Sequence, residues 1–213
     1  MALLDEATTK RVENMLADLP SEVRLIVFTD DQHCEYCTEI VQLLTEVAAT
    51  SDLVSVETYE IHRDAEKARE LGIERAPVIA FLGERDYGIR FYGIPSGYEF
   101  STLLHAIHSA GHGHAHLDSS VKTYLDGLTE PVDYKVFVTP TCPYCPRAAV
   151  LAIEMAMYSN FVSANIIESA EFADLANQFE VMGVPLTVIN NKERVEGAAP
   201  ANMVIDAMRR AAA

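Results

Sequence analysis

The chain contains the same long-range pattern twice. Each copy holds two cysteines three positions apart and a proline 43 positions after the first cysteine. These residues are Cys34, Cys37 and Pro77 in the first copy, and Cys142, Cys145 and Pro185 in the second. One offset of 108 positions superposes both the dithiol and the proline. Because chance rarely repeats such a combination, the sequence predicts two tandem copies of one domain.

The length of 213 residues suits two domains of about 100 residues each. We expect a first domain over residues 1–110, a linker over residues 111–116 and a second domain over residues 117–213. The linker reads Gly-His-Gly-His-Ala-His, and its glycines mark a flexible junction. We interpret its histidines as part of a solvated linker, with binding of nickel, copper or zinc as the alternative.

Each copy reads as a strand–helix–strand half followed by a hairpin–helix half. In the first copy we expect helices at 5–18, 34–50, 64–71 and 96–109, and strands at 25–28, 53–61, 78–82 and 87–92. In the second copy we expect helices at 143–158, 170–179 and 201–210, and strands at 135–139, 162–167, 186–190 and 194–196. Parallel strands need a crossover helix, whereas a hairpin adds antiparallel strands. The order therefore predicts an α/β fold with a mixed sheet flanked by helices in each domain.

Cysteine pairs at the start of a helix favour thiol chemistry. The helix N-terminus presents unpaired N–H groups and partial positive charge, which stabilise a thiolate. A lowered cysteine pKa beside a second thiol is what disulfide exchange requires. We therefore assign Cys142 as a nucleophile at the exposed helix tip and Cys145 as its resolving partner, with Pro143 at the first helical position. Cys34 and Cys37 take the same roles in the first copy.

The two dithiols are not chemically equivalent. Glu35 replaces the proline of the second motif and places a negative charge beside Cys34, which raises the pKa of that thiol. His33 compensates in part when it is protonated. We expect unequal redox potentials, with the second dithiol dominating the reduction of a protein disulfide. The alternative for the first pair is a disulfide kept only for stability.

Zinc binding is the competing interpretation of the four cysteines. Paired Cys-x-x-Cys motifs in zinc sites usually lie about 15–20 residues apart. Here 104 residues separate Cys37 from Cys142, so we expect no metal at the cysteines.

The composition narrows the choice of partners and location. A net charge of −16 and a pI near 4.7 argue against nucleic acid or an anionic membrane surface as a partner. The N-terminus lacks a basic region and an apolar run of signal-peptide length, and no stretch approaches the roughly 18 apolar residues of a spanning helix. We expect a soluble, cytoplasmic protein.

The motifs resemble a known family. Cys-Pro-Tyr-Cys at 142–145 with the later Val-Pro at 184–185 is similar to glutaredoxin, and the order of elements is that of the thioredoxin fold. The tandem arrangement resembles the two-domain protein disulfide oxidoreductases, or glutaredoxin-like proteins, of archaea and some bacteria. Residues 86–90 and 92–100 resemble a segment typical of that family's first domain. The resemblance covers nearly the full chain and implies two tandem thioredoxin-like domains.

The resemblance also implies cis prolines that face the dithiols. The two bonds are Ala76–Pro77 and Val184–Pro185, and each leaves the backbone before the proline exposed for pairing with a substrate chain. A proline at the start of a strand is otherwise common. The fixed distance from the dithiol favours the functional interpretation.

Four further side chains are candidates near the dithiols. We expect Tyr36 and Tyr144 to shape substrate access, with ordinary surface tyrosines as the alternative. Glu60 and Glu168 end equivalent strands, where each either shuttles the proton of the inner thiol or opens the next helix. The buried aspartate of thioredoxin is absent from its usual place six residues before each motif, so proton handling has no assigned residue.

The implied function is that of a protein dithiol–disulfide oxidoreductase. It would reduce disulfides in protein substrates through a mixed disulfide, with oxidation or isomerisation as further activities. We expect no bound cofactor, electrons from a thioredoxin reductase-like flavoenzyme, and a peroxiredoxin as a further partner. Two alternatives stay open. One is the electron-transfer unit of a peroxide-reducing system, as in alkyl hydroperoxide reductases, against which two intact dithiols and the lack of a flavin domain argue. The other is a redox-inert assembly module.

Overall fold

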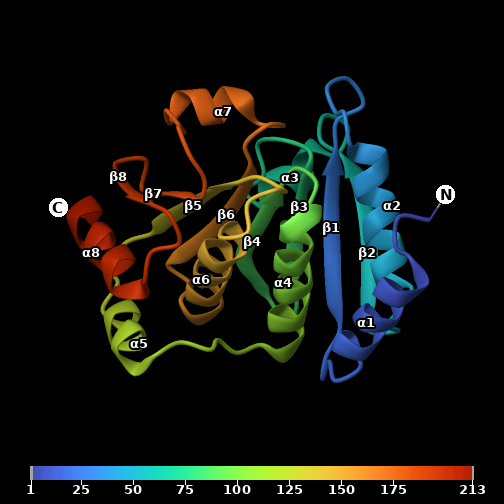
Figure 1. The fold of residues 1–213 in the computed structure, drawn as a ribbon, viewed down its shortest axis with the longest axis horizontal. Coiled ribbons are helices and arrows are strands. Elements are labelled where there is room, and N and C mark those ends of the chain that lie inside the picture. Colours follow the sequence, from blue (N-terminus) through green and yellow to red (C-terminus); the bar gives the residue numbers. More distant parts are fainter. Residues whose placement is uncertain (1, 213) are drawn as a thin grey trace.

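A computed structural model describes residues 2–212 as one eight-stranded mixed sheet with helices on both faces (Figure 1). The strands are β1 (Val23–Thr29), β2 (Val54–Glu60), β3 (Val78–Leu82), β4 (Asp86–Tyr92), β5 (Val132–Val138), β6 (Val162–Glu168), β7 (Leu186–Ile189) and β8 (Glu193–Glu196). The helices are α1 (Glu6–Leu16), α2 (Cys37–Ala48), α3 (Ala65–Glu70), α4 (Phe100–His112), α5 (Ser119–Asp126), α6 (Cys145–Tyr158), α7 (Ala173–Gln178) and α8 (Ala201–Ala212), with a 3-10 turn η1 at Gly97–Glu99. None of these helices is long and apolar enough to cross a membrane.

The sheet contains two copies of one four-stranded unit. Its order is β2-β1-β3-β4-β6-β5-β7-β8, so the second four strands repeat the order of the first four. In each unit the first two strands are parallel and the hairpin strands are antiparallel. The tandem thioredoxin-like architecture expected from the repeat is confirmed.

The units join head to tail rather than face to face. Strand β4 pairs in parallel with β6 over residues 89–92 and 164–167. Helices α4 and α6 lie side by side over this junction (Figure 1). Between them, His105 Nε2 lies 2.7 Å from Glu154 Oε1, and the His116 backbone N–H donates to the other oxygen of Glu154. The two sheets are therefore continuous.

Alternation along the strands builds a core on each side of the sheet. In β1, Leu25 and Val27 face the larger core, which α1, α2, α4, α5, α6 and α8 cover. Ile26 and Phe28 face the opposite side and pack with residues of α3. In the second unit, Phe137 of β5 likewise packs beneath α7. This period of two is what a strand buried on both faces requires.

The direction of the strands places both dithiols at one edge of the sheet. Strands β1 and β5 run parallel to each other, because two antiparallel steps and two parallel steps separate them. Each Cys-x-x-Cys motif follows one of these strands. The carboxyl ends of parallel strands share an edge, so both motifs lie there.

The helices after the dithiols begin later than the sequence predicts. Helix α2 starts at Cys37 instead of Cys34, and α6 starts at Cys145 instead of Pro143. The Cys142 N–H donates to the Thr139 carbonyl at 3.1 Å, which forms a turn ahead of the helix. The placement of Pro143 at the first helical position is therefore wrong, and the first cysteine of each motif lies in the preceding turn.

The junction between the units differs from the expected linker. Gly111 and His112, which the sequence places in the linker, form the end of α4. The helix ends at Gly113, whose φ of 69° is the left-handed conformation that favours glycine at a helix C-terminus. Helix α5 follows and was not predicted, because its eight residues carry only two buried apolar side chains, Val121 and Leu125.

Candidate active sites

The second dithiol lies next to its cis-proline loop and is buried. Cys142 is 8% exposed, Cys145 is fully buried, and both are free thiols. The Cys142 thiol donates to the Val184 carbonyl across 3.7 Å. The Val184–Pro185 bond is cis, as expected. The structure therefore brings together four residues that the sequence assigned to this site, with a burial of Cys142 that the helix-tip argument did not predict.

The inner thiol is held in its protonated form. Burial raises the pKa of Cys145, and the neighbouring Cys142 and the negative charge of Glu99 add to this effect. A contact with the Thr139 backbone opposes it only in part. Because the thiolate is the reactive species, Cys145 needs a proton acceptor before it can attack a mixed disulfide.

Glu99 is the carboxylate that sequence reasoning missed at this site. It is fully buried, and neither carboxylate oxygen has a hydrogen-bond partner of good geometry among the described residues. Burial raises its pKa to about 7, although the nearby Thr102 hydroxyl opposes the rise. A group with this pKa exchanges protons readily at neutral pH. Because its charge also acts on Cys145, Glu99 is the candidate acceptor for the proton of that thiol.

Glu99 reaches the second site from the first unit. It lies in η1, which follows β4, the strand paired with the second unit. The Tyr98 N–H donates to the Pro140 carbonyl at 2.9 Å, just before the second motif. Gly97 has φ +57°, and a Cβ at this position would lie 2.3 Å from the same carbonyl oxygen. This close approach seats η1 against the turn that carries Cys142.

The glutamates singled out from the sequence have a different role. Glu60 Oε2 accepts a hydrogen bond from the Arg63 N–H at 2.6 Å, and Glu168 Oε2 accepts one from the Glu171 N–H at 2.7 Å. Each carboxylate thus caps the turn that leads into the next helix, which was the alternative interpretation.

Glu99, in contrast, could not be identified from the sequence. It is a single glutamate between two aromatic residues, Tyr98 and Phe100, and belongs to no recognisable motif.

The first dithiol differs in oxidation state and exposure. Cys34 and Cys37 form a disulfide, and both are half-buried. Asp30 Oδ1 accepts hydrogen bonds from the N–H groups of Gln32 and His33 at 2.8 and 3.1 Å, which shapes the loop before the motif. The Ala76–Pro77 bond is cis, as expected.

Acidic groups surround the first motif. Glu35 is exposed, and its hydrogen bond with the Tyr36 hydroxyl is the main cause of the raised pKa of that tyrosine. Glu171 of the second unit is also near, and burial together with the charges of Glu168 and Glu35 raises its pKa to about 7. Strand β2, which corresponds to β6, is an edge strand. No η1-like segment therefore pairs beside the first motif among the described residues, so it has no counterpart of Glu99.

The cis prolines share one further contact. The Gly93 N–H donates to the Pro77 carbonyl at 3.1 Å, and the Gly197 N–H donates to the Pro185 carbonyl at 2.8 Å. Both glycines have positive φ, which lets the chain turn back toward the proline. The proline loops are thus fixed in the same way in both units.

The two tyrosines remain at the surface. Tyr144 is 69% exposed and Tyr36 is 36% exposed. Both adjoin their cysteines in the chain, so a role in substrate access stays a prediction.

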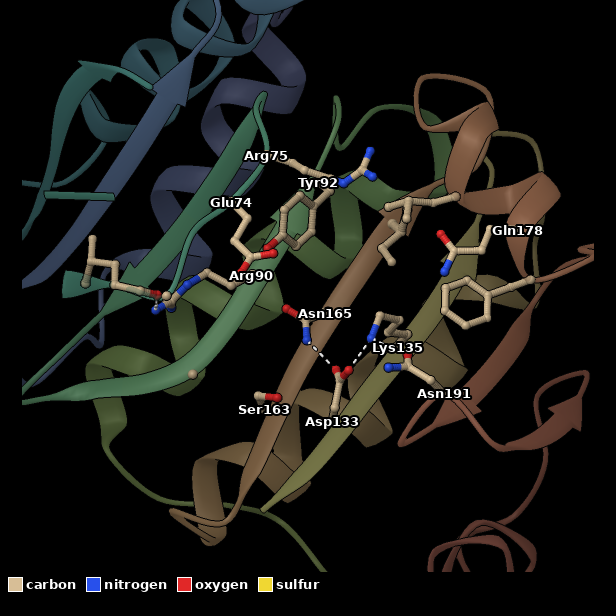
Figure 2. Close-up of a pocket in the computed structure, with 16 residues that line it drawn as sticks. Glu74, Arg75, Arg90, Tyr92, Asp133, Lys135, Ser163, Asn165, Gln178 and Asn191 are labelled. Carbon is tan, nitrogen blue, oxygen red and sulfur yellow. Dashed lines mark hydrogen bonds and ion pairs between the residues drawn. The ribbon is translucent and has the colours of Figure 1, made fainter. Parts of the chain in front are cut away.

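A separate cavity of about 560 Å³ lies on the sheet face toward α3 and α7, away from the cysteines (Figure 2). Most of its charged groups, namely Arg75, Arg90, Asp133 and Lys135, are paired within the protein. Asp133 accepts hydrogen bonds from Lys135 and, at 2.9 Å, from Asn165, as the dashed lines in Figure 2 mark. Arg90 donates to both oxygens of Asp86. The cavity therefore offers little uncompensated charge to a ligand.

Comparisons with known proteins agree with this geometry. A family profile described as thioredoxin domain matches residues 132–209. A structure of the F component of alkylhydroperoxide reductase from Enterococcus faecalis is 26% identical with a TM-score of 0.88, covering 96% of this chain and 99% of that one. A protein disulfide oxidoreductase from Aeropyrum pernix K1 is 28% identical with a TM-score of 0.88, covering 99% of this chain and 95% of that one.

A curated relative, the F component of alkyl hydroperoxide reductase from Pseudomonas aeruginosa, is 23% identical over 190 residues, which cover 89% of this chain. The match spans only 34% of that relative, so the chain corresponds to about a third of it. The continuous two-unit sheet, the paired dithiols with their cis prolines and these similarities lead to one conclusion. The chain is a two-domain thioredoxin-fold thiol–disulfide oxidoreductase with two Cys-x-x-Cys motifs.

Proposed function

We propose that this protein reduces disulfides in protein substrates, with Cys142 and Cys145 as the principal dithiol. The observation that carries the proposal is the position of the Cys142 thiol, 3.7 Å from the Val184 carbonyl beside the cis proline. An extended substrate chain that pairs with this exposed backbone would bring its disulfide to Cys142. The resolving thiol of Cys145 belongs to the same motif, and the charge of Glu99 acts on it.

The reaction consists of two exchange steps. The Cys142 thiolate attacks one sulfur of the substrate disulfide, which forms a mixed disulfide and releases the other substrate sulfur as a thiolate. Glu99 then accepts the Cys145 proton, and the Cys145 thiolate attacks the Cys142 sulfur. This step forms the Cys142–Cys145 disulfide and releases the second substrate thiol. Two electrons pass to the substrate, and an external dithiol donor must return them.

We assign a thioredoxin reductase-like flavoenzyme as that donor, because this chain offers dithiols as its electron carriers. The reducing direction suits the cytoplasm, where thiols are kept reduced. Cys34 and Cys37 would relay electrons or act as a secondary site, since the carboxylates of Glu35 and Glu171 disfavour a thiolate there.

A second candidate function is electron delivery to a peroxiredoxin. The TM-score of 0.88 to the F component of alkylhydroperoxide reductase, over 99% of that solved chain, supports it. Both functions use the same chemistry at Cys142 and differ in the oxidised partner. Parallel rate measurements with a disulfide-bonded protein such as insulin and with an oxidised peroxiredoxin distinguish them.

The test of the principal site compares Cys142→Ser with the matched variant Cys34→Ser. In the reduction of a disulfide-bonded protein at neutral pH, Cys142→Ser is expected to lose most activity and Cys34→Ser to retain most of it. In addition, Cys145→Ser should accumulate a covalent mixed disulfide with the substrate on Cys142. A greater loss in Cys34→Ser would make the first dithiol the principal reductant. Undiminished reduction in both variants would contradict the proposal for either site.

A further inference from the structure

Three side chains with metal-binding atoms converge far from both dithiols. His108 and His112 lie one turn apart near the end of α4, and Asp18 follows α1. Their ligand atoms all lie within 4.8 Å of one another. The imidazole rings are stacked with centroids 4.0 Å apart, so both present an edge to the same carboxylate.

The distances favour a shared ion over direct hydrogen bonds. Asp18 Oδ1 lies 3.5 Å from His108 Nε2, and Asp18 Oδ2 lies 4.0 Å from His112 Nε2. Hydrogen bonds between such groups are normally about 2.7–3.2 Å long. Two donors of one tetrahedral Zn²⁺ ion, each about 2.0–2.2 Å from the metal, stand roughly 3.4 Å apart. The 68% exposed carboxylate of Asp18 is free to close the remaining gap.

The hydrogen bond made by the His112 ring suits a metal ligand. Its Nδ1 lies 3.0 Å from the His108 carbonyl oxygen. A carbonyl oxygen only accepts, so Nδ1 is the donor in this contact, and Nε2 is the ring nitrogen whose lone pair can bind a metal ion. This lone pair belongs to the atom that faces Asp18. Hydrogen bonding of the second ring nitrogen to a carbonyl is the usual way in which proteins orient metal-binding histidines.

The surrounding fold holds the two segments together without an ion. Ser21 Oγ donates to the Gly111 carbonyl at 2.5 Å. A Cβ at Gly111 would lie 2.6 Å from the Leu19 side chain, so a glycine allows α4 to approach the loop after α1. Leu19 is itself buried in the larger core. The loop that carries Asp18 is thus fixed against the histidine-bearing turn.

We propose that Asp18, His108 and His112 form a binding site for a divalent transition-metal ion, for which Zn²⁺ is the expected occupant. Two imidazole nitrogens and one carboxylate oxygen are ligands that Zn²⁺ commonly takes in proteins. The exposed side of the site leaves the fourth coordination position open to a water molecule. The bound ion would clamp the end of α4, where the chain leaves the first unit, to the loop after α1.

The experiment titrates Zn²⁺ into the untagged full-length protein by calorimetry. Both dithiols are first oxidised to disulfides, so that no thiolate competes for the metal. We expect one Zn²⁺ per chain. His108→Ala and Asp18→Asn should each weaken binding by about tenfold or more, in the range seen when groups that support a metal site are removed. His33→Ala is the control, because His33 lies 3.7 Å from Asp30, which His62 also contacts at the opposite end of β1 from Asp18, and it should leave binding at the proposed site like that of the wild type.

Two further readouts separate a lost ligand from a damaged fold. Asp18 is largely exposed, so Asp18→Asn should keep the circular dichroism spectrum and unfolding temperature of the metal-free protein. Zn²⁺ should raise the unfolding temperature of the wild type and have little effect on Asp18→Asn, since only a ligand of the native state stabilises it. The proposal would be overturned if the wild type did not bind Zn²⁺ at about 100 micromolar, which is on the order of the dissociation constant of a weak specific site. Wild-type affinity in both variants would overturn it equally.

Discussion

Replacing Glu99 with glutamine tests the proton-transfer step and separates chemistry from stability. Glutamine has nearly the same shape but cannot ionise. Because the pKa of Glu99 is about 7, roughly half of the molecules hold an ionised proton acceptor at neutral pH. A positioned general base typically contributes about 10²–10⁴-fold to a rate. We expect Glu99→Gln to slow the resolving attack of Cys145 by about 10²-fold, which corresponds to about 2.7 kcal/mol.

One effect acts in the opposite direction and is smaller. Removal of the Glu99 charge lowers the pKa of Cys145 and makes its thiolate easier to form. The charge of Glu99 ranks behind burial and the neighbouring Cys142 among the causes of the raised pKa. Even a fall of one pKa unit, worth about 1.4 kcal/mol, would return only about tenfold in thiolate population. A net loss of about tenfold or more therefore remains.

The stability of Glu99→Gln should change in the opposite sense to its activity. The folded state raises the pKa of Glu99 from 4.5 to about 7. Between these values the folded state holds more protons than the unfolded state, so the wild type loses stability as the pH rises through this window. At pH 7 and above this penalty amounts to at most about 3 kcal/mol, and Glu99→Gln removes it. The variant should thus be the more stable protein above pH 7.

The assay follows reduction of a disulfide-bonded protein from pH 5.5 to 8.5, with acid quenching to measure the lifetime of the mixed disulfide on Cys142. Urea unfolding at pH 5 and pH 8 gives the stability. Glu168→Gln is the matched control, because a glutamine oxygen still accepts the Glu171 N–H, and it should keep its activity. An unchanged rate and pH profile in Glu99→Gln, or a parallel loss in Glu168→Gln, would refute the assignment of Glu99 as the proton acceptor.

Three further substitutions test the packing around this site. Gly97→Ala should lower the free energy of unfolding by at least about 1–2 kcal/mol in urea titrations, because φ is +57° and the new Cβ would meet the Pro140 carbonyl, and it should impair Cys142 more than Cys34. Although burial acts to raise the pKa of Glu154, hydrogen bonds from His105 and the His116 N–H hold it below its ordinary value. Glu154→Gln should therefore cost about 1.5–3 kcal/mol at pH 7, and its difference from the wild type in urea should shrink as the pH falls below about 4.3, where this contribution is lost. Tyr134→Phe should have a free energy of unfolding within about 1 kcal/mol of the wild-type value or above it, because the buried hydroxyl has no hydrogen-bond partner of good geometry among residues 2–212. A loss above about 2 kcal/mol would show that this hydroxyl is satisfied.

Local patterns in the sequence were sufficient to predict the repeat, the order of helices and strands along each unit, and the two cysteine pairs. The dithiol spacing and the proline at a fixed distance are properties of one short segment each, and the periodicity of β1 and β5 follows from burial on both faces. The cis bonds at Pro77 and Pro185 were expected from the resemblance to a known family rather than from local patterns. Element boundaries were less accurate. The turn closed by the Cys142 N–H delays the start of α6, and such a turn leaves little trace in hydrophobic periodicity.

Contacts between the units could not be predicted from either copy alone. Glu99 lies 46 positions before Cys145, and the parallel pairing of β4 with β6 brings it near enough for its charge to act on that thiol. The same head-to-tail arrangement leaves β2 at the edge of the sheet, so two motifs of nearly equal sequence occupy different environments. Asp18 is likewise 90 positions from His108, and the close approach allowed by Gly111 brings them together. A sequence repeat determines the fold of each unit, whereas the packing of one unit on the next decides which side chains meet, because that depends on three-dimensional neighbours rather than on local propensity.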